Sequence, residues 1–217
     1  MTFNDKELTE LSDAVRVTMS EKRFRHTKSV EEEIARMGAL YLPEKIPELR
    51  AAALLHDIAK EMPTEEQQEI CRMNDDPDLA HAIRSPAIMH GHTASYLIPI
   101  IYPKYVLPEI ISAVYKHTTG AEEMSVFDKL LFLADFIEPE RPWQVCQDVR
   151  RLFWDAMPDT EPERMRRLDE TVLYILEFTV QYLRDKGTIP DPTTEKAAAA
   201  LRREYEIRYR LKEKPND

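Results

Sequence analysis

The sequence predicts an all-α fold, built as a single-domain bundle of helices. Apolar side chains recur every three to four residues along most of the chain, which places them on one face of a helix. Stretches that alternate apolar and polar residues, as strands do, are hard to find, and the four glycines form no hairpin dipeptide. A chain of 217 residues with 43% hydrophobic content is long and apolar enough to bury one substantial core.

Ten helices account for this periodicity. In chain order, we expect them at residues 5–19, 26–42, 47–60, 64–73, 87–101, 107–117, 125–138, 143–156, 161–186 and 193–212. Prolines interrupt the helical pattern between most of these segments, since proline cannot continue a helix in its interior. The prolines at these breaks are Pro43, Pro63, Pro103, Pro108, Pro139 and Pro142.

Local signals mark several helix ends. Thr64 with Gln67 has the pattern of a capping box before "EEQQEICRM". Ser125 precedes the apolar run "VFDKLLFLADFIE" as a candidate N-cap, and Gly187 follows the long helix as a stop signal. The final segment is alanine-rich and then highly charged, which is typical of a terminal helix with a frayed end.

Composition narrows the classes of function. The 40 acidic residues outnumber the 30 basic ones, which argues against the concentrated basic face of a nucleic-acid-binding protein. A small anionic substrate stays compatible with this charge, because a metal ion can supply local positive charge. The N-terminus has no signal-peptide pattern, no apolar run is long enough to span a bilayer, and the two cysteines form no disulfide framework. We therefore expect a soluble, cytoplasmic protein without membrane partners and with reduced thiols at Cys71 and Cys146.

Ligand-type side chains lie beside several apolar stretches. His56 and Asp57 are adjacent at the end of the apolar run in "AAALLHDIAKEMP", and Asp135 lies inside "KLLFLADFIEPER". A buried carboxylate requires a cation or several donors. Imidazole and carboxylate ligands without thiolates suit iron, manganese, zinc, nickel or cobalt. The residues alone leave two interpretations open, a metal site or hydrogen-bonded core histidines.

Five short segments together resemble a known family. They are "RHT", "LLHDIAK", "MHGHTASYL", "VYKHTTG" and "LLFLADFIEPER", and their order and spacing are similar to those of the HD-domain superfamily of metal-dependent phosphohydrolases. More narrowly, they resemble the YqeK-type symmetrical bis(5'-nucleosyl)-tetraphosphatases, which are taken to cut diadenosine tetraphosphate into two ADP. The resemblance implies an HD-type helical bundle over residues 1–195, and residues 196–217 form a charged helical extension beyond it.

The resemblance also implies roles for individual residues. Asp57 would bridge two ions, and His92, two residues after His90, would miss them. Asp57 and Lys60 would be catalytic. Glu138 lies three residues after Asp135 on nearly the same helix face, so it would orient a ligand or a lysine. The full metal set would be His26, His56, Asp57, His90, His117 and Asp135. Contacts to substrate would come from Lys60, Thr118, Thr119, Gly120 and Arg141.

The cofactors implied are two divalent or trivalent transition-metal ions. The resemblance favours iron, and manganese, cobalt, nickel and zinc stay open. Two such ions about 3.5–4 Å apart acidify a bridging water, and the hydroxide would attack a phosphorus of the tetraphosphate with ADP leaving. A solvated Lys60 and a surface ion pair between Arg141 and Glu138 or Glu140 are the non-catalytic interpretations of those residues.

Other functions fit the same residues. One is a phosphatase of mononucleotides or nucleoside triphosphates, and another is a non-catalytic HD module that binds a nucleotide. A purely structural bundle is a third, and would be indifferent to metal removal. Trp143 and Trp154 fit core or interface positions better than base-stacking platforms. A homodimer is the default expectation for an assembly, since most oligomers are dimers.

Overall fold

Helix α3 (Ile46–Leu55) forms the centre of the molecule. The computed structural model describes residues 3–210, and the side chains of residues 51–55 are fully buried in it. Four helices pack around α3: α1 (Asp5–Arg16), α2 (Glu21–Tyr41), α7 (Pro108–Lys116) and α8 (Val126–Ile137). Apolar residues in α3 face every direction, as expected of a helix with neighbours on all sides.

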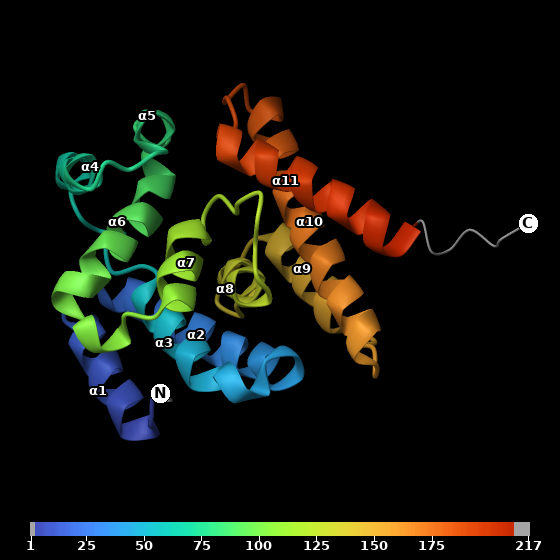
Figure 1. Cartoon of the computed structure of the whole chain (residues 1–217), viewed down its shortest axis with the longest axis horizontal. Coiled ribbons are helices and arrows are strands. Elements are labelled where there is room, and N and C mark those ends of the chain that lie inside the picture. Colours follow the sequence, from blue (N-terminus) through green and yellow to red (C-terminus); the bar gives the residue numbers. More distant parts are fainter. Residues whose placement is uncertain (1–2, 211–217) are drawn as a thin grey trace, which may run out of the picture.

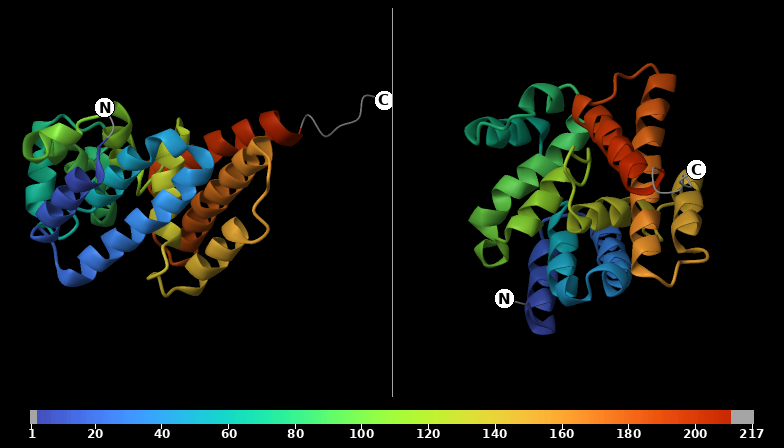
Figure 2. Two further views of the ribbon diagram at one scale, coloured as in Figure 1. Left: turned by 90° about the horizontal axis from the view of Figure 1, so that it is seen from below. Right: turned by 45° about the vertical axis from the view of Figure 1, so that its right-hand side comes forward.

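The C-terminal helices form a second layer. Helix α10 (Glu161–Asp185) packs against α11 (Pro192–Tyr205), α9 (Gln144–Trp154) and α8. Figure 1 shows these helices on the right and the α1–α7 group on the left, with α8 between them. Figure 2 shows the same division from two further directions. Helix α8 therefore contributes to both layers, and nine of its residues are buried.

Three further helices lie on the α7 side. Helix α6 (Pro86–Ile101) packs against α7, α4 (Thr64–Met73) and the short α5 (Leu79–Ala82). Short helical turns complete the path: η1 (Pro43–Lys45), η2 (Pro103–Tyr105) and the π-helical η3 (Glu206–Arg210). Residues 3–210 contain no strand, which confirms the all-α prediction. None of the helices in this range combines the length and the apolar character needed to cross a bilayer.

Two helix boundaries differ from the sequence prediction in ways that shape the site. Helix α2 begins five positions earlier than expected, because the Ser20 side chain caps it and Glu61 holds Ser20 through its N–H and hydroxyl. Helix α3 ends at Leu55 and not at 60, because the chain continues in tight turns such as Lys60 N–H to Asp57 C=O. His56 and Asp57 therefore lie just after the C-terminal end of α3, outside its regular helix.

The predicted caps had mixed outcomes. Ser125 caps α8, as predicted, in a capping box with Asp128. Gly187 follows α10 with a φ of +71°, a conformation that glycine adopts without strain. The Thr64–Gln67 capping box is wrong, because Pro63 is the N-cap and the Gln67 amide donates to the Met62 carbonyl instead.

The C-terminal segment joins the main core. Helix α11 begins at Pro192 and buries Ala197, Leu201 and Tyr205 with the rest of the molecule. The division of the chain between residues 195 and 196 would fall inside this helix, and it stays a prediction. The helix expected to reach 212 ends at Tyr205, and residues 211–217 lie outside the described residues.

Candidate metal centre and pocket

The six residues expected to be metal ligands meet in one place, although they come from five segments of the chain. His26 lies in the second turn of α2, and His56 with Asp57 follows the end of α3. His90 lies on α6, His117 ends α7 and Asp135 is near the end of α8. Four of them are almost completely buried: His56, Asp57, His90 and His117.

The carboxylate of Asp57 lies between two pairs of imidazoles. Its Oδ1 is 3.0 Å from Nε2 of His90 and 3.9 Å from Nε2 of His117. Its Oδ2 is 3.4 Å from Nε2 of His56 and 3.6 Å from Nε2 of His26. Each oxygen therefore faces its own pair of ring nitrogens, which is the arrangement required of a carboxylate that bridges two ions.

Asp135 closes the opposite side of the cluster. Its Oδ1 lies 3.0 Å from Nε2 of His26 and 3.9 Å from Nε2 of His56. Three overlapping groups result, and in each the ligand atoms lie within 4.8 Å of one another. The groups are His26–His56–Asp57, His56–His117–Asp135 and Asp57–His90–His117.

The far side of three imidazoles is fixed by a hydrogen bond. His56 and His117 donate from Nδ1 to the carbonyls of Ala53 and Val114, at 2.6 and 2.7 Å. His26 Nδ1 lies 3.0 Å from Oε1 of Glu138, which is buried. With the proton on Nδ1, the lone pair of Nε2 faces the centre of the cluster.

The donor atoms at the centre fit a cation. Nε2 of His26 and Nε2 of His56 are buried and face carboxylate oxygens of Asp57 and Asp135. Buried nitrogens and carboxylate oxygens that converge in this way form a set of ligand atoms that a cation can bind. Imidazole nitrogens and carboxylate oxygens suit a transition-metal ion.

The side chains of the cluster shift one another's pKa values. Burial alone would raise the pKa values of Asp57 and Asp135. The neighbouring His56 instead holds the pKa of Asp57 far below its usual range. Arg141 and His26 have the same effect on the pKa of Asp135. Burial lowers the pKa values of His90 and His117, so their rings are neutral. His26 differs, because Asp135 and Glu138 outweigh the effect of burial and raise its pKa to about 9.

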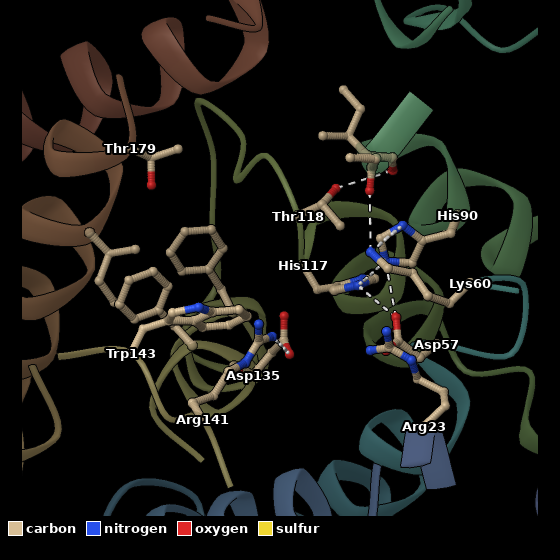
Figure 3. A pocket seen from close by; sticks show the side chains of 15 residues that line it. Arg23, Asp57, Lys60, His90, His117, Thr118, Asp135, Arg141, Trp143 and Thr179 are labelled. Atoms are coloured by element: carbon tan, nitrogen blue, oxygen red, sulfur yellow. Dashed lines mark hydrogen bonds and ion pairs between the residues drawn. The ribbon is translucent and has the colours of Figure 1, made fainter. Parts of the chain in front are cut away.

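A pocket of about 390 Å³ opens onto this cluster (Figure 3). Three cationic side chains line it. Arg23 donates to Oδ2 of Asp57 at 2.7 Å, and Arg141 donates to both the backbone carbonyl and the carboxylate of Asp135. Lys60 Nζ lies 3.2 Å from Nδ1 of His90 and 3.3 Å from the carbonyl of Ala87. Burial lowers the pKa of Lys60.

The expected substrate contacts separate into two groups. Lys60, Thr118 and Arg141 line the pocket. Thr119 and Gly120 are buried and do not line it, and the Thr119 hydroxyl donates to the carbonyl of Gly120. Gly120 has a φ of +67°, and a Cβ there would meet Leu176 at 3.1 Å, so its position supports a packing role.

Two residues near the cluster, Arg23 and Trp143, differ from the sequence analysis, and a third, His92, agrees with it. Arg23 was missed, and the available signal was its place one turn before His26 on the same helix. Trp143 lines the pocket and is exposed, so the expected core position is wrong for it, and the interface position stays a prediction. His92 lies outside the cluster, buried 3.3 Å from Asp76 and stacked on Tyr115, which agrees with its expected exclusion from the ligand set.

Comparison with known proteins gives consistent matches. Residues 23–140 match the HD domain family. The symmetrical bis(5'-nucleosyl)-tetraphosphatase of Bacillus subtilis is 27% identical over 165 residues, which cover 75% of this chain and 84% of that protein. The protein of the same name from Staphylococcus aureus is 27% identical over 172 residues, covering 77% of this chain and 80% of that protein.

A solved structure has a similar fold. It is a predicted HD superfamily hydrolase involved in NAD metabolism from Clostridium acetobutylicum, with a TM-score of 0.78 and 25% sequence identity. The superposition covers 94% of this chain and all of that one. The similarity therefore extends beyond the family match into the C-terminal helices.

Proposed function

Because this chain belongs to the HD domain family, we propose that it is a metal-dependent hydrolase that cuts diadenosine tetraphosphate into two ADP. Two relatives whose names give this symmetrical cleavage match three quarters of the chain or more. The observation that carries the proposal is the position of Asp57, whose two oxygens each face a separate pair of histidines.

The proposed cofactors are two transition-metal ions, with iron first and manganese, cobalt, nickel or zinc as alternatives. His26, His56 and Asp135 would hold one ion with Asp57, and His90 and His117 would hold the other with Asp57. When bound, such ions lower the pKa of a coordinated water and neutralise phosphoryl charge. The convergence of the Nε2 atoms of His26 and His56 on the carboxylates of Asp57 and Asp135 supports this assignment.

The cationic side chains of the pocket would hold the phosphate chain. The pocket places Lys60, Arg23 and Arg141 around the cluster (Figure 3). Lys60 is half-buried and turned toward His90, so it is placed to stabilise phosphoryl charge or the leaving oxygen. Arg141 presents a planar fork that suits phosphate, and Thr118 adds a hydroxyl at the pocket wall.

The decisive experiment incubates purified protein with diadenosine tetraphosphate and each of several divalent metals, and separates the products by chromatography. Two ADP from the wild type, and none from Asp57→Asn, would support symmetrical cleavage at this cluster. His92→Asn is the matched control, because His92 is as buried as the ligands but lies outside the pocket.

Other product patterns contradict the proposal in distinct ways. AMP with ATP would mean asymmetrical cleavage. Release of inorganic phosphate from mononucleotides or nucleoside triphosphates, without turnover of the dinucleotide, would favour the phosphatase alternative. Nucleotide binding without any turnover would favour a non-catalytic module. The homodimer and the cytoplasmic location stay predictions beside this function.

A further inference from the structure

Trp143 has an unusual position for a tryptophan. It is the N-cap residue of α9, its carbonyl accepts hydrogen bonds from the N–H groups of Cys146 and Gln147, and its side chain is 57% exposed. Large aromatic side chains are usually well buried, and an exposed one beside a pocket is a common feature of binding sites. The backbone of Trp143 is thus fixed while its ring stays open to a ligand.

The ring belongs to the same pocket as the metal cluster. Trp143 lines this pocket together with Asp135 and Arg141, and the Arg141 guanidinium carbon lies 5.4 Å from its ring centroid. Arg141 also binds Asp135, so one arginine connects the cluster to the indole. Figure 3 shows Trp143 and Thr179 on the side away from Lys60 and His90, with Asp135 and Arg141 between.

The two ends of the pocket differ in chemistry. The end near the cluster carries the cations Lys60 and Arg23. Trp143 and Thr179 lie on the other side (Figure 3), and the residues that line the pocket also include Phe132, Phe136 and Ile175. A charged end joined to an aromatic end matches a molecule with phosphates at one end and a flat, apolar ring system at the other.

We propose that Trp143 is a stacking platform for the nucleobase of the bound nucleotide. The proposal rests on the proposed function for the identity of the phosphate chain. Arg141 supports the platform from the cluster side and fixes the distance between the base and the phosphates. Stacking on an indole accepts any base, since every base has a π face. Because stacking does not depend on the edge of the base, we expect ADP and GDP to bind with similar affinity.

The test compares ligands with and without a base. ADP and inorganic tripolyphosphate are titrated into wild type, Trp143→Ala and Trp143→Phe, and the metal content of each protein is measured alongside. Base–aromatic stacking is lost on alanine substitution at a cost that corresponds to about a tenfold weaker Kd. Trp143→Ala should therefore weaken ADP binding about tenfold and leave tripolyphosphate binding within about twofold. Trp143→Phe should recover most of the ADP affinity.

A fluorescence titration gives an independent readout. The chain has two tryptophans, and Trp154 lies outside the pocket, where it donates to Glu33. Trp154→Phe therefore leaves Trp143 as the only indole. Its emission should change on addition of ADP or GDP and stay constant with tripolyphosphate.

Several results would overturn the platform. They are no ADP binding by the wild type, equal effects of Trp143→Ala on ADP and tripolyphosphate, or no effect on either. A change of oligomeric state in Trp143→Ala, with ADP affinity intact, would assign the ring to a subunit interface instead. These results are separable from the proposed function: a wild type that binds ADP through Trp143 but does not cut diadenosine tetraphosphate would disprove only the hydrolase.

Discussion

Asp57 and His90 meet in the core of the site, with Oδ1 of the carboxylate 3.0 Å from Nε2 of the imidazole. The contact joins the turn after α3 to helix α6. The other oxygen of Asp57 faces His56 and His26. One carboxylate thus connects histidines from separate helices, and whatever binds between them also holds those helices together.

Removing metal should therefore destabilise the fold. A ligand that binds only the folded state adds about 2.7 kcal/mol when its free concentration is about 100 times Kd. For a protein of this size, that loss lowers the melting temperature by about 5–10 °C. Calorimetry with and without a chelator measures it. Asp57→Asn should melt at the same temperature in both conditions. A wild type indifferent to chelation would point to a purely structural cluster.

Glu138 should control metal affinity without touching the metal. Its Oε1 lies 3.0 Å from Nδ1 of His26 and fixes the ring with Nε2 toward the cluster. Loss of such an orienting carboxylate typically weakens metal binding about 10–100-fold. We expect this for Glu138→Gln in a competition titration with a chromophoric chelator.

The neighbouring Glu140 provides the matched control. Its side chain is exposed, and its contact with Glu138 is made by its backbone N–H. Glu140→Gln removes the same charge two positions away and should bind metal as the wild type does. Equal losses in both variants would mean that only the general negative charge of this segment matters.

His26 should account for close to one proton released on metal binding at pH 7.5. Asp135 and Glu138 raise the pKa of His26 to about 9 against the effect of burial, so the metal-free ring is protonated at neutral pH. A metal binds only the unprotonated ring. The affinity should therefore fall about tenfold for each pH unit below about 9, a dependence that can be measured between about pH 6.5 and 8.5.

The other ligands should add little to this proton count. The pKa values of His90 and His117 are lowered by burial, and Asp57 and Asp135 are already ionised. Calorimetric titration with Mn²⁺ in two buffers of different ionisation enthalpy measures the protons released. His26→Asn should bind more weakly and release about one proton fewer than the wild type. An affinity that stays flat over this pH range would contradict the assignment of His26.

The sequence was most informative where polar residues interrupt apolar runs. His56, Asp57 and Asp135 were identifiable because burial of such groups requires partners, and the resemblance supplied the histidines on other helices. Arg23 was missed because α2 was expected to start after it. The cap that starts the helix earlier depends on Glu61, a contact across the fold that periodicity does not reveal.

The position of Trp143 in the pocket wall could not be predicted from the sequence either. Whether an aromatic residue is buried or lines a pocket depends on what lies opposite, and here that includes Ile175 and Thr179 of α10. Thr119 and Gly120 are the opposite case, because the resemblance implies that they contact substrate but neither lines the pocket, and the contact stays a prediction. A motif transferred as a block includes residues that bind and residues that shape the backbone, and only the position of each side chain separates them.

Gly120 permits a direct test of that distinction. Its φ of +67° penalises any side chain, and a Cβ would lie 3.1 Å from Leu176 and 3.2 Å from Ala197. Gly187 has a similar φ of +71°, but a Cβ there meets nothing within 4 Å. Comparing alanine substitutions at Gly120 and Gly187 therefore separates the cost of backbone strain from the cost of a packing clash. The left-handed conformation alone costs about 1–2 kcal/mol for a residue with a Cβ.

We expect Gly187→Ala to lose about 1 kcal/mol of unfolding free energy in urea, and Gly120→Ala to lose clearly more, at least about 2 kcal/mol. If Gly120 only shapes the turn after His117, folded Gly120→Ala should retain the metal content and the substrate KM of the wild type. A raised KM with stability equal to that of Gly187→Ala would instead support the substrate contact that the resemblance implies. The two outcomes differ because packing strain acts on the whole fold, whereas a lost contact acts only when substrate is bound.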